Sequence, residues 1–154
     1  MPPITVSAEV NRSAEEVFSY ATDPSRFFEW QKGVVSGHME SQGALKVGDR
    51  CHTTRHIGFS DRPDTSELVR LDPPRQWSVR GLTGPIRAAV DVAVEPISQT
   101  SARLTIALAF DGRGISRILV PLVVERQARR EMPVNLAALK NRLEAPLDDD
   151  ENTS

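Results

Sequence analysis

The chain has 154 residues, with 19 basic and 21 acidic side chains and a formal net charge of -2. This length fits one domain, and the balanced charge gives no basic surface of the kind that neutralises nucleic-acid phosphates. No apolar run reaches the ~20 residues that a bilayer requires and no signal-peptide core is recognisable, so we expect a cytoplasmic protein with no membrane insertion and no nucleic-acid partner.

The first residues predict a strand followed by two helices. Residues 4–10 alternate between apolar and polar, as in a half-buried strand. Ser13 and Glu16 form a capping box, in which the hydroxyl accepts an amide of the first turn and the carboxylate reaches back to the Ser13 amide. Asp23-Pro24 ends this helix and starts a second, because proline fits a first helical position.

Six further strands are predicted in immediate succession. The clearest alternation runs from Ile86 to Val94, where the even-numbered residues are all apolar and one face is therefore dry. The segment Ser60–Asp64 reads as a turn. Short connections favour an antiparallel meander over parallel crossover units. The six strands cover residues 33–40, 48–59, 65–71, 76–82, 86–94 and 101–110.

A long helix is predicted over residues 115–144, because apolar residues recur there at intervals of three, four or their sums. A sheet with one dry face must have that face covered, and only this helix is long enough to do so. The sequence therefore predicts an α+β protein with a single domain at 1–145. The acidic segment 146–154 lacks apolar anchors and is expected to be disordered.

The segment Val10–Trp30 joins a strand end, a helix with a Val-Phe pair, an Asp-Pro step and a tryptophan. In this it resembles the START-like (SRPBCC) helix-grip superfamily, and within it the polyketide cyclase/dehydrase and lipid-transport family. The resemblance implies a helix-grip fold over residues 3–145: a seven-stranded curved antiparallel sheet wrapped around a long C-terminal helix, with two short helices between the first and second strands. It also implies a cavity between sheet and helix for a hydrophobic or aromatic small molecule.

Side chains on the strand 48–59 give the first candidates for that cavity. Apolar residues such as Cys51 stand at odd positions there, so Thr53 and Arg55 are expected to face the interior with them. A turn centred near Asp61 would place Arg55 opposite Glu67. Charges on a dry face must be paired or line a wet cavity. Either the two residues form a structural ion pair, or a register shift sends both outward, or they line the cavity and orient a polar group of a ligand.

The aromatic residues leave two alternatives open. Trp30 and Trp77 either stack on a flat ligand or belong to the core. Tyr20 either donates a proton through its phenol or packs with its hydroxyl exposed. No residue is assigned a catalytic role. The candidate ligand-contacting residues are Tyr20, Trp30, Cys51, Thr53, Arg55, Glu67, Trp77, Val90, Phe110 and Leu122.

Metal and cofactor chemistry finds little support in the sequence. His52 and His56 lie at i and i+4 on a strand, about 13 Å apart, which is too far for one metal ion. Cys51 is the only cysteine, so neither an internal disulfide nor a thiolate zinc site can form. We expect no metal and no cofactor.

Three functions remain open. Only 5% of the residues are aromatic, and many inward positions carry Ala or Val, so the sheet and helix should leave room for an apolar guest that the protein binds or carries. The alternative is a polyketide aromatase/cyclase, in which Tyr20, Thr53, Arg55 and Glu67 would shift protons and stabilise an enolate oxygen. A protein-partner module is a third alternative. We expect a monomer or a weak homodimer.

Overall fold

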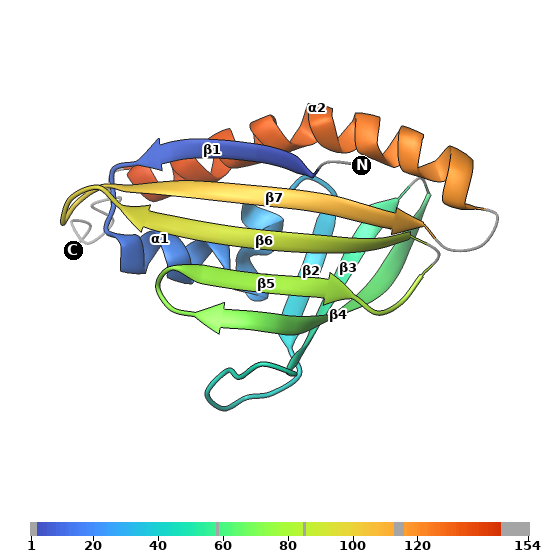
Figure 1. The fold of residues 1–154 in the computed structure, drawn as a ribbon, viewed down its shortest axis with the longest axis horizontal. Helices are drawn as coiled ribbons and strands as arrows, with labels where there is room; N and C mark the ends of the chain where they lie inside the picture. Colours follow the sequence, from blue (N-terminus) through green and yellow to red (C-terminus); the bar gives the residue numbers. More distant parts are fainter. Residues whose placement is uncertain (1–2, 58, 85, 113–115, 146–154) are drawn as a thin grey trace, which may run out of the picture.

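The alternating segments form seven antiparallel strands in the computed structural model, and the helical segment runs along them (Figure 1). The structure describes residues 3–57, 59–84, 86–112 and 116–145, without the side chains of 57, 86, 111, 112 and 116–123; the predicted disordered tail lies outside the described residues. The elements are β1 (Ile4–Val10), α1 (Ala14–Ala21), the 3-10 helix η1 (Pro24–Glu29), β2 (Val34–Met39), β3 (Arg50–Ile57), β4 (Ser60–Asp72), β5 (Gln76–Gly81), β6 (Ile86–Pro96), β7 (Ala102–Gly112) and α2 (Ser116–Glu144).

The two short helices start where the capping residues predict. The Ser13 hydroxyl oxygen accepts the Glu16 amide at 3.2 Å, while the Ser13 hydroxyl, not its amide, lies 3.2 Å from the Glu16 carboxylate. The Asp23 carboxylate accepts the Ser25 amide at the start of η1. These local bonds fix the two turns that close one end of the sheet.

The sheet has the strand order β1-β7-β6-β5-β4-β3-β2, which confirms the predicted meander. β1 returns to pair with β7, so β1 and β2 form the two edges. α2 packs against β1 and β7, on the concave side of the curled sheet. Its buried side chains recur at intervals of four, four and three residues, as one helix face requires: Ala128, Met132, Leu136 and Leu139. The predicted helix-grip architecture is confirmed.

The hairpin between β3 and β4 turns earlier than the sequence suggests. Ser60–Asp64 was predicted as a turn, but β4 starts at Ser60, which pairs with Ile57. β5 pairs with β4 only as far as Ser66, so Pro63 stands in an edge portion of the strand. Proline is tolerated there because no second neighbouring strand needs its missing amide.

This register separates Arg55 from Glu67, so the predicted pairing of these residues is wrong. Arg55 lies opposite Arg62, and Glu67 lies opposite Arg50. The register of β4 against β5 shifts between Leu68 and Arg70. Because of this bulge, even-numbered residues of β4 face inward before it and odd-numbered residues face inward after it. Leu71 therefore faces inward although Glu67, at the same parity, faces outward, and parity alone predicts the wrong orientation for Glu67.

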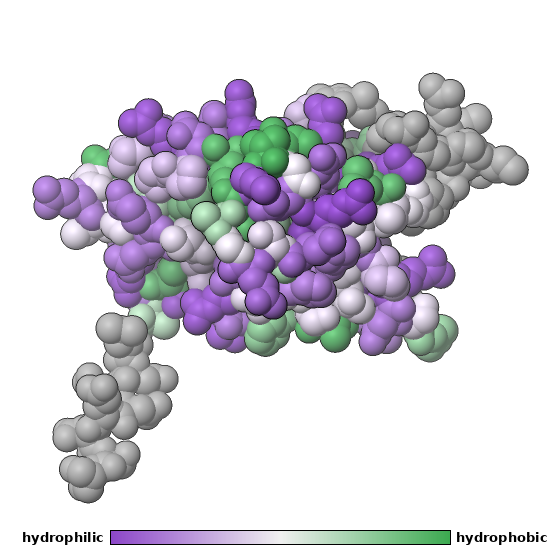
Figure 2. Space-filling model, turned by 90° about the horizontal axis from the view of Figure 1, so that it is seen from below, coloured by the Kyte–Doolittle hydropathy of each residue, from purple (hydrophilic) through white to green (hydrophobic). Residues whose placement is uncertain are grey.

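The outer surface is mainly polar. In the view of Figure 2 hydrophilic side chains predominate; the largest group of hydrophobic ones lies near the middle of the upper half, and smaller ones are scattered over the rest of this face. Of the helices in the described part of the chain, none combines the length and the apolar character that crossing a membrane demands. The large exposed hydrophobic side chains are Phe28, Val35, Leu45, Val47, Phe59, Val69, Ile97 and Val134.

Candidate functional site

The concave face of the sheet is tightly packed at one end and partly exposed at the other. On β6, Val92 and Val94 are buried, whereas Ala88 and Val90 on the same face remain partly exposed. The same change occurs along β3, β4, β5 and β7. We call the partly exposed set the open end, and it comprises the inward residues Thr53, Arg55, Asp64, Ser66, Gly81, Ala88, Val90, Leu108 and Phe110.

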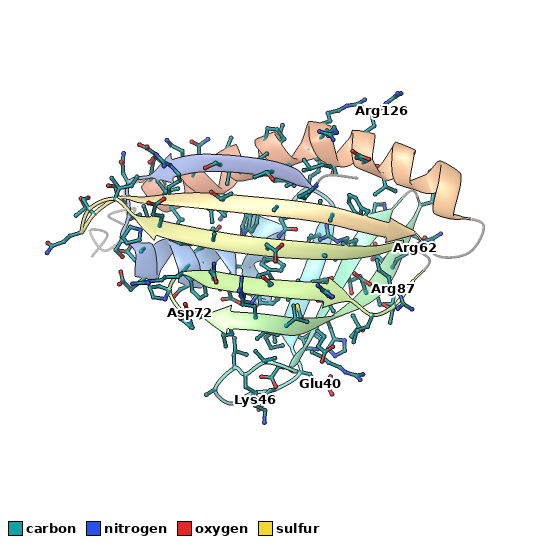
Figure 3. All side chains as sticks on the ribbon, viewed as in Figure 1. Glu40, Lys46, Arg62, Asp72, Arg87 and Arg126 are labelled. Carbon is teal, nitrogen blue, oxygen red and sulfur yellow. The ribbon has the colours of Figure 1, made fainter. Side chains whose placement is uncertain are left out.

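The open end is continuous across five strands. Ser66 pairs with Gly81, and a Cβ placed on Gly81 would lie 3.2 Å from the Ala88 amide nitrogen. Ala88 in turn pairs with Phe110. Figure 3 places Arg62 and Arg87 at this end of the molecule and Asp72 towards the other. The strands therefore present one connected, half-exposed floor.

Arg55 is a half-buried cation of the open end. Its Nη2 donates to Gln31 Oε1 at 3.2 Å. Burial lowers the pKa of Arg55, while the negative charges of Asp64 and Glu131 act in the opposite direction. A guanidinium has five N–H donors, and the described residues provide one acceptor within hydrogen-bond distance, Gln31. The remaining donors can hold a carbonyl, phenol or carboxylate oxygen.

Thr53 and Cys51 lie on the same face of β3 as Arg55. Thr53 pairs with Asp64 of β4, and Cys51 pairs with Ser66. Cys51 is buried, and burial raises the pKa of its thiol to about 11. The thiol therefore stays protonated at neutral pH, which disfavours a nucleophilic role.

Both tryptophans lie in an aromatic row that lines the packed end of the concave side. The Phe27 ring meets Trp30 edge-on at a centroid distance of 5.8 Å, and it meets Trp77 in the same way at 6.3 Å. Trp30 caps the C-terminal end of η1, and the next residue, Gln31, accepts a hydrogen bond from Arg55. The row therefore runs from the surroundings of Arg55 towards the packed end.

Tyr20 lies at the junction of α1, η1 and α2. Its hydroxyl donates to Glu29 at 2.9 Å, and Arg142 of α2 approaches the same carboxylate at 3.8 Å. The Arg26 guanidinium lies 5.5 Å from the centre of the Tyr20 ring. Burial, followed by the bond to Glu29, raises the pKa of Tyr20 to about 12. These contacts connect α1, η1 and α2. The Tyr20 hydroxyl proton is used in the hydrogen bond to Glu29.

The other predicted site residues divide between the two faces. Val90 and Phe110 belong to the open end. Glu67 faces the outer side, because it alternates with buried Leu68. The side chain of Leu122 lies outside the described residues.

The histidines occupy the outer face of β2 and β3. His38 stacks on His52 at 5.2 Å, His52 contacts Thr65 and Glu40 at 3.1 Å each, and His56 contacts Asp61. In the described ranges no three metal-binding side chains converge on a common point.

Sequence reasoning missed the polar neighbours of Arg55. Asp64 was assigned to the predicted turn Ser60–Asp64, whereas the pairing of Ser60 with Ile57 places it on β4, opposite Thr53 and on the inward face. Gln31 and Glu131 come from other elements, far away in the sequence. No local pattern could have associated them with β3.

The sequence and the fold both match known proteins. The family described as polyketide cyclase / dehydrase and lipid transport matches residues 1–144. No curated protein matches the sequence. A START superfamily protein from Mycobacterium smegmatis superposes with a TM-score of 0.76 at 14% identity, covering 94% of this chain and 98% of the other.

Two further similar structures carry names that refer to cyclisation. The Zhui aromatase/cyclase from a Streptomyces species has a TM-score of 0.70 at 17% identity, over 93% of this chain and 96% of the other. The di-domain ARO/CYC BexL has a TM-score of 0.73 at 19% identity, over 94% of this chain; the chain spans only 47% of that protein. At these identities the likeness shows the fold alone.

Proposed function

Because the chain belongs to the polyketide cyclase / dehydrase and lipid transport family, we propose that it binds and carries a small hydrophobic or aromatic molecule at the open end of the concave face. Arg55 would orient a polar group of that molecule. The other candidate contacts from the open end are Thr53, Val90 and Phe110.

The observation that supports this proposal is the change in burial along single strands. Val92 and Val94 are sealed, whereas Val90 and Leu108, on the same face, retain exposed apolar area. Removing such area from water is favourable by roughly 25 cal/mol per Å². A small apolar molecule seated there would gain this free energy without displacing the packed end.

Arg55 adds selectivity to this apolar floor. A guanidinium that is largely removed from water makes strong hydrogen bonds to an oxygen that reaches it. The charges of Asp64 and Glu131 act on Arg55 and partly offset the effect of burial on its pKa, so we expect a neutral carbonyl or phenol to be accepted as well as an anion. The bound molecule would place one of its oxygens towards Arg55 and its rings over Val90 and Leu108.

Two tryptophan substitutions on one strand test the proposal. Val90→Trp fills the concave face, whereas Ala93→Trp adds the same bulk at an exposed position on the outer face of β6. Titration with the fluorescent apolar probe N-phenylnaphthylamine should show at least about tenfold weaker binding for Val90→Trp and unchanged binding for Ala93→Trp. Equal affinities in both variants would refute the proposed location.

An aromatase/cyclase activity is the second candidate, and the polar groups around Arg55 favour it. Aldol cyclisation requires a group that moves a proton and a donor that stabilises the enolate oxygen. Asp64 and Glu131 are the carboxylates whose charges act on Arg55, so they would move the proton while Arg55 holds the oxygen.

Binding and turnover can be separated with a linear poly-β-ketone thioester as probe. Asp64→Asn and Glu131→Gln should leave its affinity within about threefold, and under the enzymatic alternative at least one should slow ring formation by about a hundredfold. If the wild-type protein binds the probe but forms no ring faster than buffer does, carriage alone remains.

A further inference from the structure

The two tryptophan indole N–H groups have no acceptor in the described part of the chain. Trp30 is 7% exposed and Trp77 is 3% exposed, and each Nε1 is shielded from solvent. Burying a donor without an acceptor is unfavourable, and folded proteins rarely leave such groups unsatisfied. Two of them in one aromatic row call for an acceptor from outside the chain.

The position of the row connects these donors with the open end. Trp30 is followed by Gln31, whose side chain accepts from Arg55. Trp77 faces inward on β5, where its partner on β6 is Val92, one inward position beyond Val90. The Phe27 ring lies between the two indoles. A molecule lying over Val90 therefore ends next to the aromatic row.

We propose that Trp30 and Trp77 determine ligand specificity by donating their indole N–H groups to an oxygen acceptor on an aromatic ligand. This inference rests on the proposed binding function and names the ligand chemistry: a flat ring system with a ring-attached carbonyl oxygen. Both nitrogens are shielded from solvent in this structure, so a ligand oxygen has to displace the atoms that cover an indole edge before it can accept from it. A hydrocarbon of the same shape leaves both donors unsatisfied.

The experiment is a ¹H–¹⁵N NMR titration of the full chain. The sequence holds two tryptophans, so the spectrum contains two indole N–H signals, and Trp30→Phe assigns both by removing one. The probes are α-tetralone and tetralin, which share a ring skeleton and differ in one carbonyl oxygen. We expect tetralone to move at least one indole signal downfield as it binds, and tetralin to move neither downfield.

Substitution of each tryptophan tests whether its indole N–H group contributes to the preference for tetralone over tetralin. The ratio of tetralone to tetralin affinity should fall by about fivefold in Trp30→Phe or Trp77→Phe, because each removes one donor and retains a ring. Phe28→Leu, at an exposed position of η1, serves as the matched control with an unchanged ratio.

The results separate this inference from the proposed function. If both probes bind and neither indole signal moves downfield, the ligand-binding function stands and the role of the tryptophans is refuted. The same holds if the affinity ratio does not change in either variant. If neither probe binds and N-phenylnaphthylamine does not bind either, the binding function itself fails.

Discussion

At Arg55, burial and neighbouring carboxylates act in opposite directions on one guanidinium. Burial lowers its pKa, and the charges of Asp64 and Glu131 keep the cation favourable. A charge in this setting is expensive to leave without partners, so its donors are directed towards oxygen atoms. Gln31 provides one of these, and a ligand oxygen can provide the next.

Replacing Arg55 should therefore affect ligands according to their polar groups. Arg55→Gln is expected to weaken binding of anilinonaphthalene sulfonate by about tenfold, because it removes a charge-assisted hydrogen bond. Binding of the uncharged N-phenylnaphthylamine should change by less than about threefold. Arg80→Gln, at an exposed position of β5, is the control. An equal loss for both dyes would contradict an anchoring role for Arg55.

Two buried groups give the free energy of unfolding a dependence on alkaline pH. Burial raises the pKa of Cys51 from 9.0 to about 11, and burial with the Glu29 bond raises that of Tyr20 from 10.0 to about 12. Both ionise more readily in the unfolded chain. Their contributions are complete below the unfolded values and are lost as pH rises through the folded values.

Urea unfolding between about pH 8 and pH 12 measures this loss through the transition midpoint. The midpoint should fall from about pH 9 upward, first with Cys51 and then with Tyr20. Cys51→Ala should flatten the earlier part of the curve and Tyr20→Phe the later part. A midpoint that falls equally steeply in the double variant would exclude these two groups as its cause.

At the scale of elements, the contact between η1 and β2 depends on a missing side chain. A Cβ on Gly37 of β2 would lie 2.4 Å from the Pro24 carbonyl oxygen in η1. Backbone cannot move out of the way as a flexible side chain can. Gly37 therefore lets η1 settle on the strand and brings Trp30 and Gln31 to the concave side.

Gly37→Ala should lower the free energy of unfolding by about 2 kcal/mol, because η1 must shift away from β2. It should also weaken N-phenylnaphthylamine binding. Gly43→Ala is the control, since its new methyl group would meet only the Ser41 hydroxyl at 4.0 Å. Urea denaturation of both variants measures the difference, and equal stabilities would show that η1 is not held in this way.

Sequence patterns predicted some strands correctly and the pairing of others incorrectly. Alternation predicted β1 with its observed bounds, because a strand with one dry face shows its period directly. The prediction of how β3 pairs with β4 was wrong for two physical reasons. Asp61, Pro63 and Asp64 are typical turn residues that here continue a strand, and the bulge before Arg70 exchanges the faces of β4.

At the scale of the whole molecule, the site depends on tertiary packing that no local pattern encodes. Parity on β3 predicted that Arg55 shares a face with buried Cys51, and the structure places both on that face. The groups that act on Arg55 from outside the sheet come from the segment after η1 and from α2, at positions 31 and 131. They meet only after the meander has curled and α2 lies along its concave side, as Figure 1 shows.

The packed end and the open end of the concave face differ in how completely their side chains are buried. Residues such as Leu68, Leu104 and Leu139 are fully buried and hold the sheet and α2 together. Val90 and Leu108 pack against this core while remaining partly exposed. The stability of the fold can therefore reside at one end while the other end accepts a guest.

A methyl NMR titration with N-phenylnaphthylamine tests the location of the guest most directly. We predict chemical-shift changes concentrated at Val90 and Leu108, with smaller changes at Val94 and Leu104 in the packed end. Val69 and Ile97, exposed on other surfaces, should not respond. Changes centred on Val69 or Ile97, or no changes at Val90 and Leu108 at saturating dye, would contradict a binding site on the concave face.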